Sequence, residues 1–153
     1  MASNSHTLEE HFSSALHNTA RAWKLAVDRR LKYLGLSQAS WTAIAIAAKA
    51  GEPLSQIELA NRVGIEAATM VATIDRLVKA ELVVREPSPL DRRVKLVVLT
   101  KAGHQLYAKV KAEADAFRKE LLANVDKQQL TAAVKFLEHL QAVAEAAASD
   151  AKP

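Results

Sequence analysis

Two short apolar runs separated by a basic tip constrain the fold of this chain more than any other feature. The first run is Leu82-Val83-Val84-Arg85-Glu86, and the second follows Asp91-Arg92-Arg93 and ends at Leu99-Thr100. Both runs contain β-branched residues, and the segment between them carries Pro87 and Pro89, so the two runs are predicted to form a β-hairpin. Thr100 is a candidate N-cap, and a helix is therefore expected directly after the hairpin.

The residues before the hairpin predict two helices joined by a tight turn. Ser55 is a candidate N-cap, and Glu58 three residues later completes a capping box. Gly64 supplies the turn, and a longer helix from about Glu66 to Ala80 carries apolar residues at helical spacing. This pattern is typical of a helix-turn-helix. A helix-turn-helix followed by a basic hairpin is a winged helix, a fold that most often binds double-stranded DNA.

Long helices are predicted on both sides of this core. Apolar residues recur at spacings of three and four from Leu8 to Leu34, and Gly35 ends the pattern. A second helix is expected from Ser37 to Gly51, and after the hairpin Thr100 and Asp126 each begin a further helix. The predicted fold is therefore mainly α with a small β-hairpin: a winged helix-turn-helix core with N- and C-terminal dimerisation helices.

The flanking helices predict how the chain is organised. We expect residues 37–103 to form the winged helix-turn-helix DNA-binding domain, and residues 1–36 and 104–153 to form a helical dimerisation region. The apolar stripes of the flanking helices have no obvious partner within the small core, so a second copy of the chain is expected to cover them. The alternative is that these helices pack on their own domain.

Composition and motifs exclude several classes of function. The chain has no cysteine, which excludes disulfides and thiolate metal sites, and its net charge of +4 is only weak support for a nucleic-acid partner. No secretory signal or bilayer-length apolar run is visible, so we expect a cytoplasmic protein with no membrane partner. No glycine-rich phosphate loop, HExxH motif or histidine pair at i, i+4 occurs, so an enzyme, a cofactor and a metal site are not expected.

Several motifs occur in a fixed order along the chain, and they carry a resemblance. They are Leu34-Gly35-Leu36-Ser37-Gln38, Ser55-Gln56-Ile57-Glu58-Leu59-Ala60, Val63-Gly64-Ile65-Glu66, Asp75-Arg76-Leu77, Arg85, Asp91-Arg92-Arg93 and Leu99-Thr100. Together with the element order they resemble the MarR family of bacterial transcriptional regulators, and its SlyA-like branch in particular. The resemblance covers about Leu16 to Tyr107. It implies a homodimer that binds a pseudo-palindromic duplex site, with each recognition helix in a major groove and each wing in the neighbouring minor groove.

The resemblance also implies roles for the wing residues. Arg93 would insert into the minor groove, and Asp91 would hold its guanidinium in place. A narrow minor groove favours an inserted cation, and a carboxylate can orient a guanidinium. Alternate residues of an extended segment share a side, so we expect Asp91 to face Arg93 while Arg92 faces away and meets at most a phosphate. The alternative is an exposed ion pair that contributes little.

The predicted recognition helix departs from the branch pattern. The candidate DNA contacts before the wing are Ser55, Gln56, Glu66, Ala67, Ala68, Thr69, Thr73 and Arg76, with Arg76 expected on the DNA backbone. Where the branch has a proline and an arginine, this chain has Ala68 and Ala72, and Glu81 replaces a glycine after the helix. Alanine can contact a thymine methyl group. The missing arginine also supports an alternative function, a dimeric winged-helix protein-interaction adaptor with weak DNA binding.

Trp23, Arg30 and Trp41 are candidates for a ligand site. They are expected at the junction of the dimerisation helices and the winged core. In the resembling family, this crevice often accepts small aromatic carboxylates that weaken DNA binding. The tryptophan rings could stack on such a ligand, and Arg30 could bind its carboxylate. The alternative is that both tryptophans fill the core.

Overall fold

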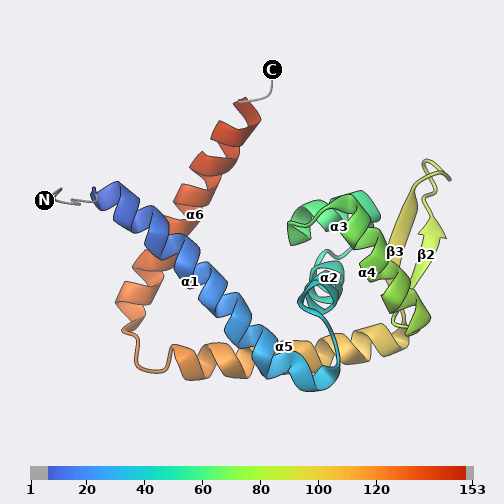
Figure 1. Ribbon diagram of the computed structural model, residues 1–153, viewed down its shortest axis with the longest axis horizontal. Helices are drawn as coiled ribbons and strands as arrows, with labels where there is room; N and C mark the ends of the chain where they lie inside the picture. The colour runs from blue at the N-terminus through green and yellow to red at the C-terminus, as the bar shows by residue number, and fades with distance from the viewer. Residues whose placement is uncertain (1–6, 151–153) are drawn as a thin grey trace, which may run out of the picture. The chain divides into compact units, whose positions relative to one another are not determined.

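The computed structural model describes residues 7–150, and its fold is mainly helical with a small antiparallel sheet (Figure 1). The elements in order are α1 (Leu8–Leu31), the 3-10 helix η1 (Lys32–Leu34), α2 (Gln38–Lys49), β1 (Leu54–Ser55), α3 (Gln56–Val63), α4 (Ala67–Lys79), β2 (Val83–Pro87), β3 (Lys95–Leu99), α5 (Lys101–Leu121) and α6 (Lys127–Asp150). The mainly α fold with a β-hairpin is confirmed. The outermost residues of the expected dimerisation region, 1–6 and 151–153, lie outside the described residues.

The helix starts predicted from capping residues are present. The Ser55 hydroxyl accepts a hydrogen bond from the Glu58 N–H at 3.2 Å, and the Glu58 carboxylate accepts one from the Ser55 N–H at 2.8 Å. The Thr100 hydroxyl likewise accepts from the Gly103 N–H at 3.1 Å. Asp126 caps the start of α6, because its Oδ1 accepts hydrogen bonds from the Gln128 N–H at 3.0 Å and the Gln129 N–H at 2.9 Å. Each contact satisfies a donor that the first helical turn leaves without a partner.

The sheet contains a strand that the sequence did not predict. Its order is β1-β3-β2 and all pairs are antiparallel. The hairpin register pairs Val83 with Leu99 and Arg85 with Val97, while β1 adds Leu54 on the other side of Val97. Because β1 is only two residues long, it shows no period-two pattern. It nevertheless fixes the start of α3 against the wing, since Ser55 pairs with Leu96 and also caps α3.

A single apolar cluster joins the helix-turn-helix to the sheet. Its buried members come from α2, α3, α4 and the strands: Ala43, Ile44, Leu54, Leu59, Ala60, Met70, Ile74, Leu77, Val83 and Val97. Gly103 allows α5 to begin close to the segment between α4 and β2. A Cβ at this position would meet the Leu82 carbonyl oxygen at 2.1 Å, which no side chain tolerates.

The end of α4 keeps a glycine-type geometry without glycine. Glu81 has φ 59°, in the left-handed region. Its N–H donates to the Val78 carbonyl at 2.9 Å, and the Leu82 N–H donates to the Leu77 carbonyl at 3.0 Å. These two bonds form a Schellman motif, which usually places glycine at this residue. The substitution noted in the sequence therefore leaves the shape of the helix end unchanged and makes Glu81 a strained residue.

The chain divides into two compact units, the first reaching to Phe117 and the second beginning at Arg118. The first unit contains the helix-turn-helix, the sheet, α1 and most of α5. The second contains α6, a helix of 24 residues with no buried residue. Within residues 7–150, no helix is long and apolar enough to cross a membrane.

Candidate nucleic-acid interface

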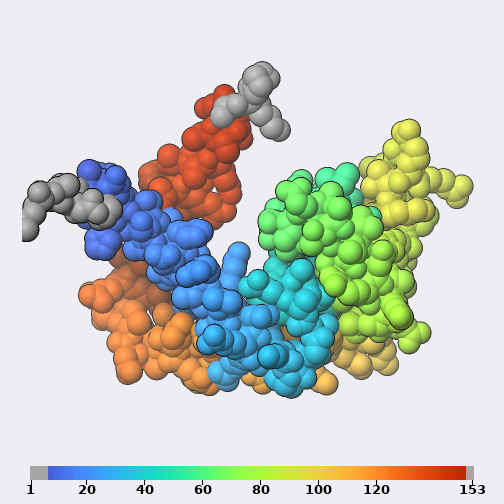
Figure 2. Space-filling model, in the orientation of Figure 1, coloured from blue at the N-terminus to red at the C-terminus, as the bar shows by residue number. Residues whose placement is uncertain are grey.

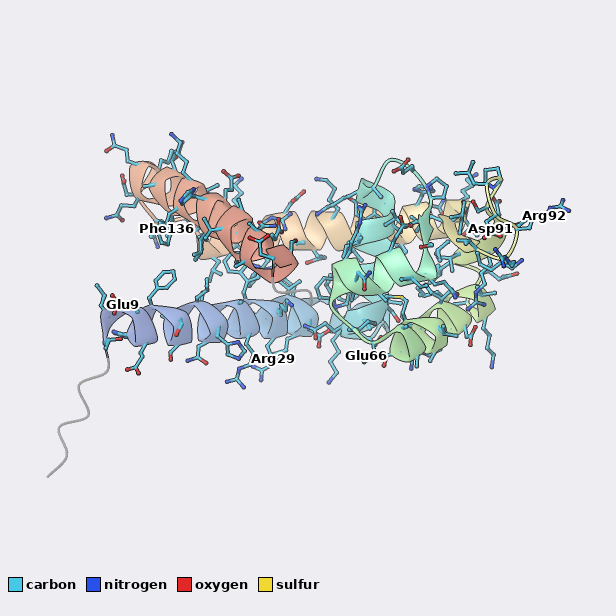
Figure 3. The ribbon with its side chains drawn as sticks, turned by 90° about the horizontal axis from the view of Figure 1, so that it is seen from above. Glu9, Arg29, Glu66, Asp91, Arg92 and Phe136 are labelled. Atoms are coloured by element: carbon cyan, nitrogen blue, oxygen red, sulfur yellow. The ribbon has the colours of Figure 1, made fainter. Side chains whose placement is uncertain are left out.

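The start of α4 presents most of the residues that the sequence assigned to DNA contact. Glu66, Ala67, Ala68 and Thr69 are all exposed, and Figure 3 shows Glu66 at the beginning of this helix. Ser55 and Gln56, at the start of α3, are half-buried. The residues at the N-terminal end of α4 are therefore accessible for contact with DNA.

Thr73 does not lie on this exposed surface. Its side chain is completely buried, and its hydroxyl donates to the Thr69 carbonyl at 2.8 Å. Arg76 approaches it from the exposed side, with Nη2 3.4 Å from the Thr73 hydroxyl. Helical spacing places residue 73 on the same side as the buried Met70 and Leu77. We therefore correct the sequence-based prediction by removing Thr73 from the candidate contacts.

The outward face of α4 carries few groups that can form hydrogen bonds. Ala68, Ala72 and Asp75 recur at spacings of four and three, so they share one side of the helix. That side is opposite the buried residues, and all three positions are exposed. Val71, beside them, is 41% exposed. The first turns of α4 therefore offer methyl groups, and charged side chains follow further along the helix at Asp75 and Arg76.

The wing is a hairpin whose loop is held by its own hydrogen bonds. The Ser88 N–H donates to the Val94 carbonyl at 2.9 Å, and the Val94 N–H donates to the Asp91 carbonyl at 2.9 Å. The Ser88 hydroxyl accepts from the Leu90 N–H at 3.3 Å. Figure 2 shows this loop, coloured yellow, projecting beyond the neighbouring helices. The loop is therefore an ordered projection that displays its charged residues.

Asp91 binds Arg93 through three hydrogen bonds at the tip of the wing. Its Oδ1 accepts from the Arg93 N–H at 3.0 Å and from Nε at 3.1 Å, and its Oδ2 accepts from Nη2 at 3.2 Å. The Arg93 side chain is 91% exposed. The hydrogen bonds from the Arg93 side chain, and then from its backbone, lower the pKa of the Asp91 carboxyl. A charged carboxylate therefore holds an exposed guanidinium in one orientation.

A turn, and not the expected extended segment, brings Asp91 and Arg93 together. Asp91 and Arg93 precede β3 and lie in a turn, closed by the bond from the Val94 N–H to the Asp91 carbonyl. The turn brings the carboxylate under the Arg93 N–H, whereas an extended segment would only place the two side chains on one side. Arg92 is exposed and extends outward from the tip (Figure 3).

A contact that the sequence did not predict connects the wing to both helices of the helix-turn-helix. Arg85, on β2, donates from Nε to Gln56 Oε1 at 2.7 Å and from Nη2 to Asp75 Oδ1 at 2.5 Å. These partners are 29 and 10 residues away in sequence. The resemblance had marked all three residues, but no local pattern could pair them.

The two tryptophans assigned to a ligand site lie in one apolar cluster. Trp23 and Trp41 pack with Leu34 and Phe117 around the buried Val27, Leu31 and Val110. The Trp23 and Phe117 rings meet edge to face, with centroids 5.5 Å apart. The Trp41 Nε1–H donates to Asp28 Oδ1 at 3.0 Å. Both rings are half-buried, so the cluster combines packing with partial access.

Arg30 is engaged by an acid beside this cluster. Its Nε donates to Glu113 Oε2 at 3.0 Å, and the Tyr33 hydroxyl donates to Glu113 Oε1 at 3.2 Å. Loss of hydration and then the charge of Glu113 raise the pKa of Tyr33. The Nε–H of Arg30 is therefore already bound to a carboxylate of the chain itself. Sequence reasoning missed Glu113 because it lies 83 residues from Arg30, on α5.

The chain is similar to transcriptional regulators in both its sequence and its fold. A sequence model of the MarR family matches residues 36–95. The crystal structure of the transcriptional regulator PA3341 is 36% identical with a TM-score of 0.82, covering 88% of this chain and 98% of that one. A MarR-family regulator from Rhodococcus sp. RHA1 is 25% identical with a TM-score of 0.77, covering 89% and 96%. CouR from Rhodococcus jostii RHA1, solved bound to p-coumaroyl-CoA, is 26% identical with a TM-score of 0.75, covering 89% and 95%.

Proposed function

Because the chain belongs to the MarR family of transcriptional regulators, we propose that it regulates transcription as a homodimer bound to a pseudo-palindromic duplex site. Within the family, its wing and helix motifs favour the SlyA-like branch. The observation that carries the DNA-binding proposal is the guanidinium of Arg93, held by Asp91 at the tip of an ordered wing. A pre-oriented cation on a projecting loop suits the negative potential of a narrow minor groove.

The recognition helix α4 is proposed to enter the major groove. Its exposed first turns carry Ala67, Ala68, Thr69 and Ala72, so base recognition there relies on methyl contacts more than on hydrogen bonds. Thymine is the only base of DNA with a methyl group in that groove. We therefore expect the preferred half-sites to contain thymine where α4 meets the bases. Arg76 and Arg92 are proposed to contact phosphates.

The dimer is proposed to form through both ends of the chain. On α1, the apolar side chains of Leu8 and Leu16 are 79% and 40% exposed. On α6, Val134 and Val143 are 46% and 53% exposed. Side chains of this size exposed along long helices support a second copy as the covering surface. A two-fold dimer would also place two recognition helices on the two halves of a pseudo-palindrome.

A small aromatic carboxylate is proposed as the effector, bound near Trp23, Trp41 and Arg30. The half-buried tryptophan rings support stacking, and the Arg30–Glu113 pair offers a cation that an incoming carboxylate could capture. CouR, which was solved bound to p-coumaroyl-CoA, supports the proposal that a regulator of this family responds to a small ligand. Displacement of Glu113 would remove an ion pair between α1 and α5 and so link ligand binding to the dimerisation helices.

Sequence selection from a random pool of duplex DNA tests the proposed function. Repeated selection should yield one pseudo-palindromic sequence whose two halves are separated by about one helical turn. The alternative, a protein-interaction adaptor, is supported by the methyl-rich face of α4. It predicts that no sequence is enriched and that generic duplex binds weakly at low salt.

A further inference from the structure

Arg85 occupies a central position between the elements that are proposed to contact DNA. It lies on β2, and its guanidinium reaches Gln56 at the first residue of α3 and Asp75 on α4. The side chain of Arg85 is 28% exposed, whereas that of Asp75 is 60% exposed. One side chain of the wing therefore joins both helices of the helix-turn-helix, from a position below the surface that they present.

The contact to Gln56 fixes the orientation of its amide. Arg85 Nε–H can only donate, so the atom it meets at 2.7 Å must be the amide oxygen. The NH2 group of Gln56 is then the part that remains for another partner. A glutamine that reads adenine uses its oxygen and its nitrogen together. With the oxygen bound to a guanidinium, Gln56 is prepared to donate to an acceptor such as a phosphate oxygen.

The contact to Asp75 neutralises an acid on the outward face of α4. Asp75 shares that face with Ala68 and Ala72, so its carboxylate lies on the surface proposed to enter the groove. An unpaired carboxylate there would repel the phosphates on both sides of the groove. Arg85 places a positive charge 2.5 Å from Asp75 Oδ1, and this charge opposes the repulsion.

We infer that Arg85 is a positioning residue for DNA binding, which acts through Gln56 and Asp75 and does not itself contact the nucleic acid. It occupies one side-chain acceptor on each helix, Gln56 Oε1 on α3 and Asp75 Oδ1 on α4. The inference rests on the proposed function, because it assigns a role within the same interface. The wing strand β2 therefore helps to order the recognition surface, in addition to carrying the wing tip.

A double-mutant cycle between Arg85 and Asp75 tests this inference. Arg85→Met keeps an unbranched side chain and removes both hydrogen bonds, and Asp75→Asn removes the carboxylate. The affinity of the full-length protein for its selected duplex is measured for the unmodified protein, both single variants and the double variant. Thermal unfolding of each variant reports stability separately. The benefit of Asp75→Asn should be at least about threefold greater in the Arg85→Met background than in the unmodified protein.

Two further variants separate positioning from direct contact. Arg92→Met is the matched control, a wing arginine on the exposed tip, and Asp75→Asn should have the same effect with or without it. Arg85→Lys keeps the charge but cannot direct two donors in a fixed fork. It should bind DNA more weakly than the unmodified protein, because it cannot bind Gln56 and Asp75 together, whereas a residue that simply meets a phosphate would tolerate lysine.

Gln56→Glu tests the same arrangement without changing Arg85. It keeps an acceptor for Arg85, but it removes the NH2 group and adds a negative charge, so affinity should fall at least about 3- to 10-fold per half-site. Three results would overturn the inference while leaving the proposed function intact. Asp75→Asn could have the same effect on affinity with Arg85 or Met at position 85. Alternatively, Arg85→Lys or Gln56→Glu could bind the duplex as tightly as the unmodified protein. Failure of the unmodified protein to bind any duplex would instead overturn the proposed function, and the inference with it.

Discussion

The sign of the effect of Asp91→Ala on DNA affinity separates an oriented wing arginine from an ordinary basic loop. Asp91 is an acid next to the proposed minor groove, so Coulomb's law alone predicts that its removal tightens binding. In the structure, however, its carboxylate accepts three hydrogen bonds from Arg93, two of them from the guanidinium. Without these hydrogen bonds Arg93 loses its fixed orientation, so the entropy cost of ordering its side chain is added to DNA binding.

The magnitudes follow from the contact that each residue is proposed to make. Arg93→Ala should cost ~1–3 kcal/mol per half-site, as expected for a positioned groove contact. Arg92→Ala should mainly reduce the salt dependence of binding, by a slope of about 0.9 for each phosphate contact that is lost. Asp91→Ala should weaken binding about 3- to 10-fold per half-site, the value expected for lost hydrogen bonds that position a partner.

Fluorescence anisotropy of a labelled selected duplex, at one moderate salt concentration, measures these affinities. Glu86→Ala is the matched control, because it removes an exposed acid of the same hairpin that lies outside the tip. That variant should bind as tightly as the unmodified protein or more tightly. If Asp91→Ala also tightens binding, the aspartate acts only as a repelling charge and the oriented-arginine account of the wing is wrong.

Four further predictions concern the helix end, the bases, the dimer and the effector. Glu81→Gly should raise the free energy of unfolding by ~0.5–1 kcal/mol in chemical denaturation, because relief of left-handed strain exceeds the added flexibility of glycine; a loss of stability would contradict the strain. Replacing thymine by deoxyuridine in the selected half-sites should weaken binding about fourfold for each methyl contacted by α4, in the same anisotropy assay; equal affinity would exclude methyl recognition. Deletion of residues 128–153 should give monomeric or aggregated protein by light scattering, whereas an intact dimer of unchanged stability would refute the proposed arrangement. Salicylate-like acids should quench the fluorescence of Trp23 and Trp41 saturably and weaken DNA binding together; quenching without a change in DNA affinity would leave both as core residues.

Local signals in the sequence were sufficient to predict the helices and the hairpin. The capping box at Ser55 and the caps at Thr100 and Asp126 each depend on residues within a few positions, and all are present. The strand β1 escaped prediction because two residues cannot display a period. Helical spacing should have excluded Thr73, which falls on the buried side of α4 with Met70 and Leu77.

Contacts between distant segments could not be predicted from spacing. The Arg85 bridge and the Arg30–Glu113 pair join residues on separate elements, and their partners are set by how those elements pack. The pairing of Asp91 with Arg93 was predicted, but the turn that produces it was not. Local chemistry therefore identified the charged residues of the site, and tertiary packing decided which of them are neutralised by a partner.

The affinity of the protein for its selected duplex, compared with a scrambled duplex of the same composition over a range of salt, tests the central claim most directly. A sequence-specific regulator should prefer the selected duplex by at least about 10³-fold at physiological salt. Its affinity should also fall linearly on logarithmic axes as salt rises from about 50 to 200 mM, because phosphate contacts release counterions. Equal affinity for the two duplexes, or no binding at the lowest salt, would contradict the assignment of this chain as a DNA-binding regulator.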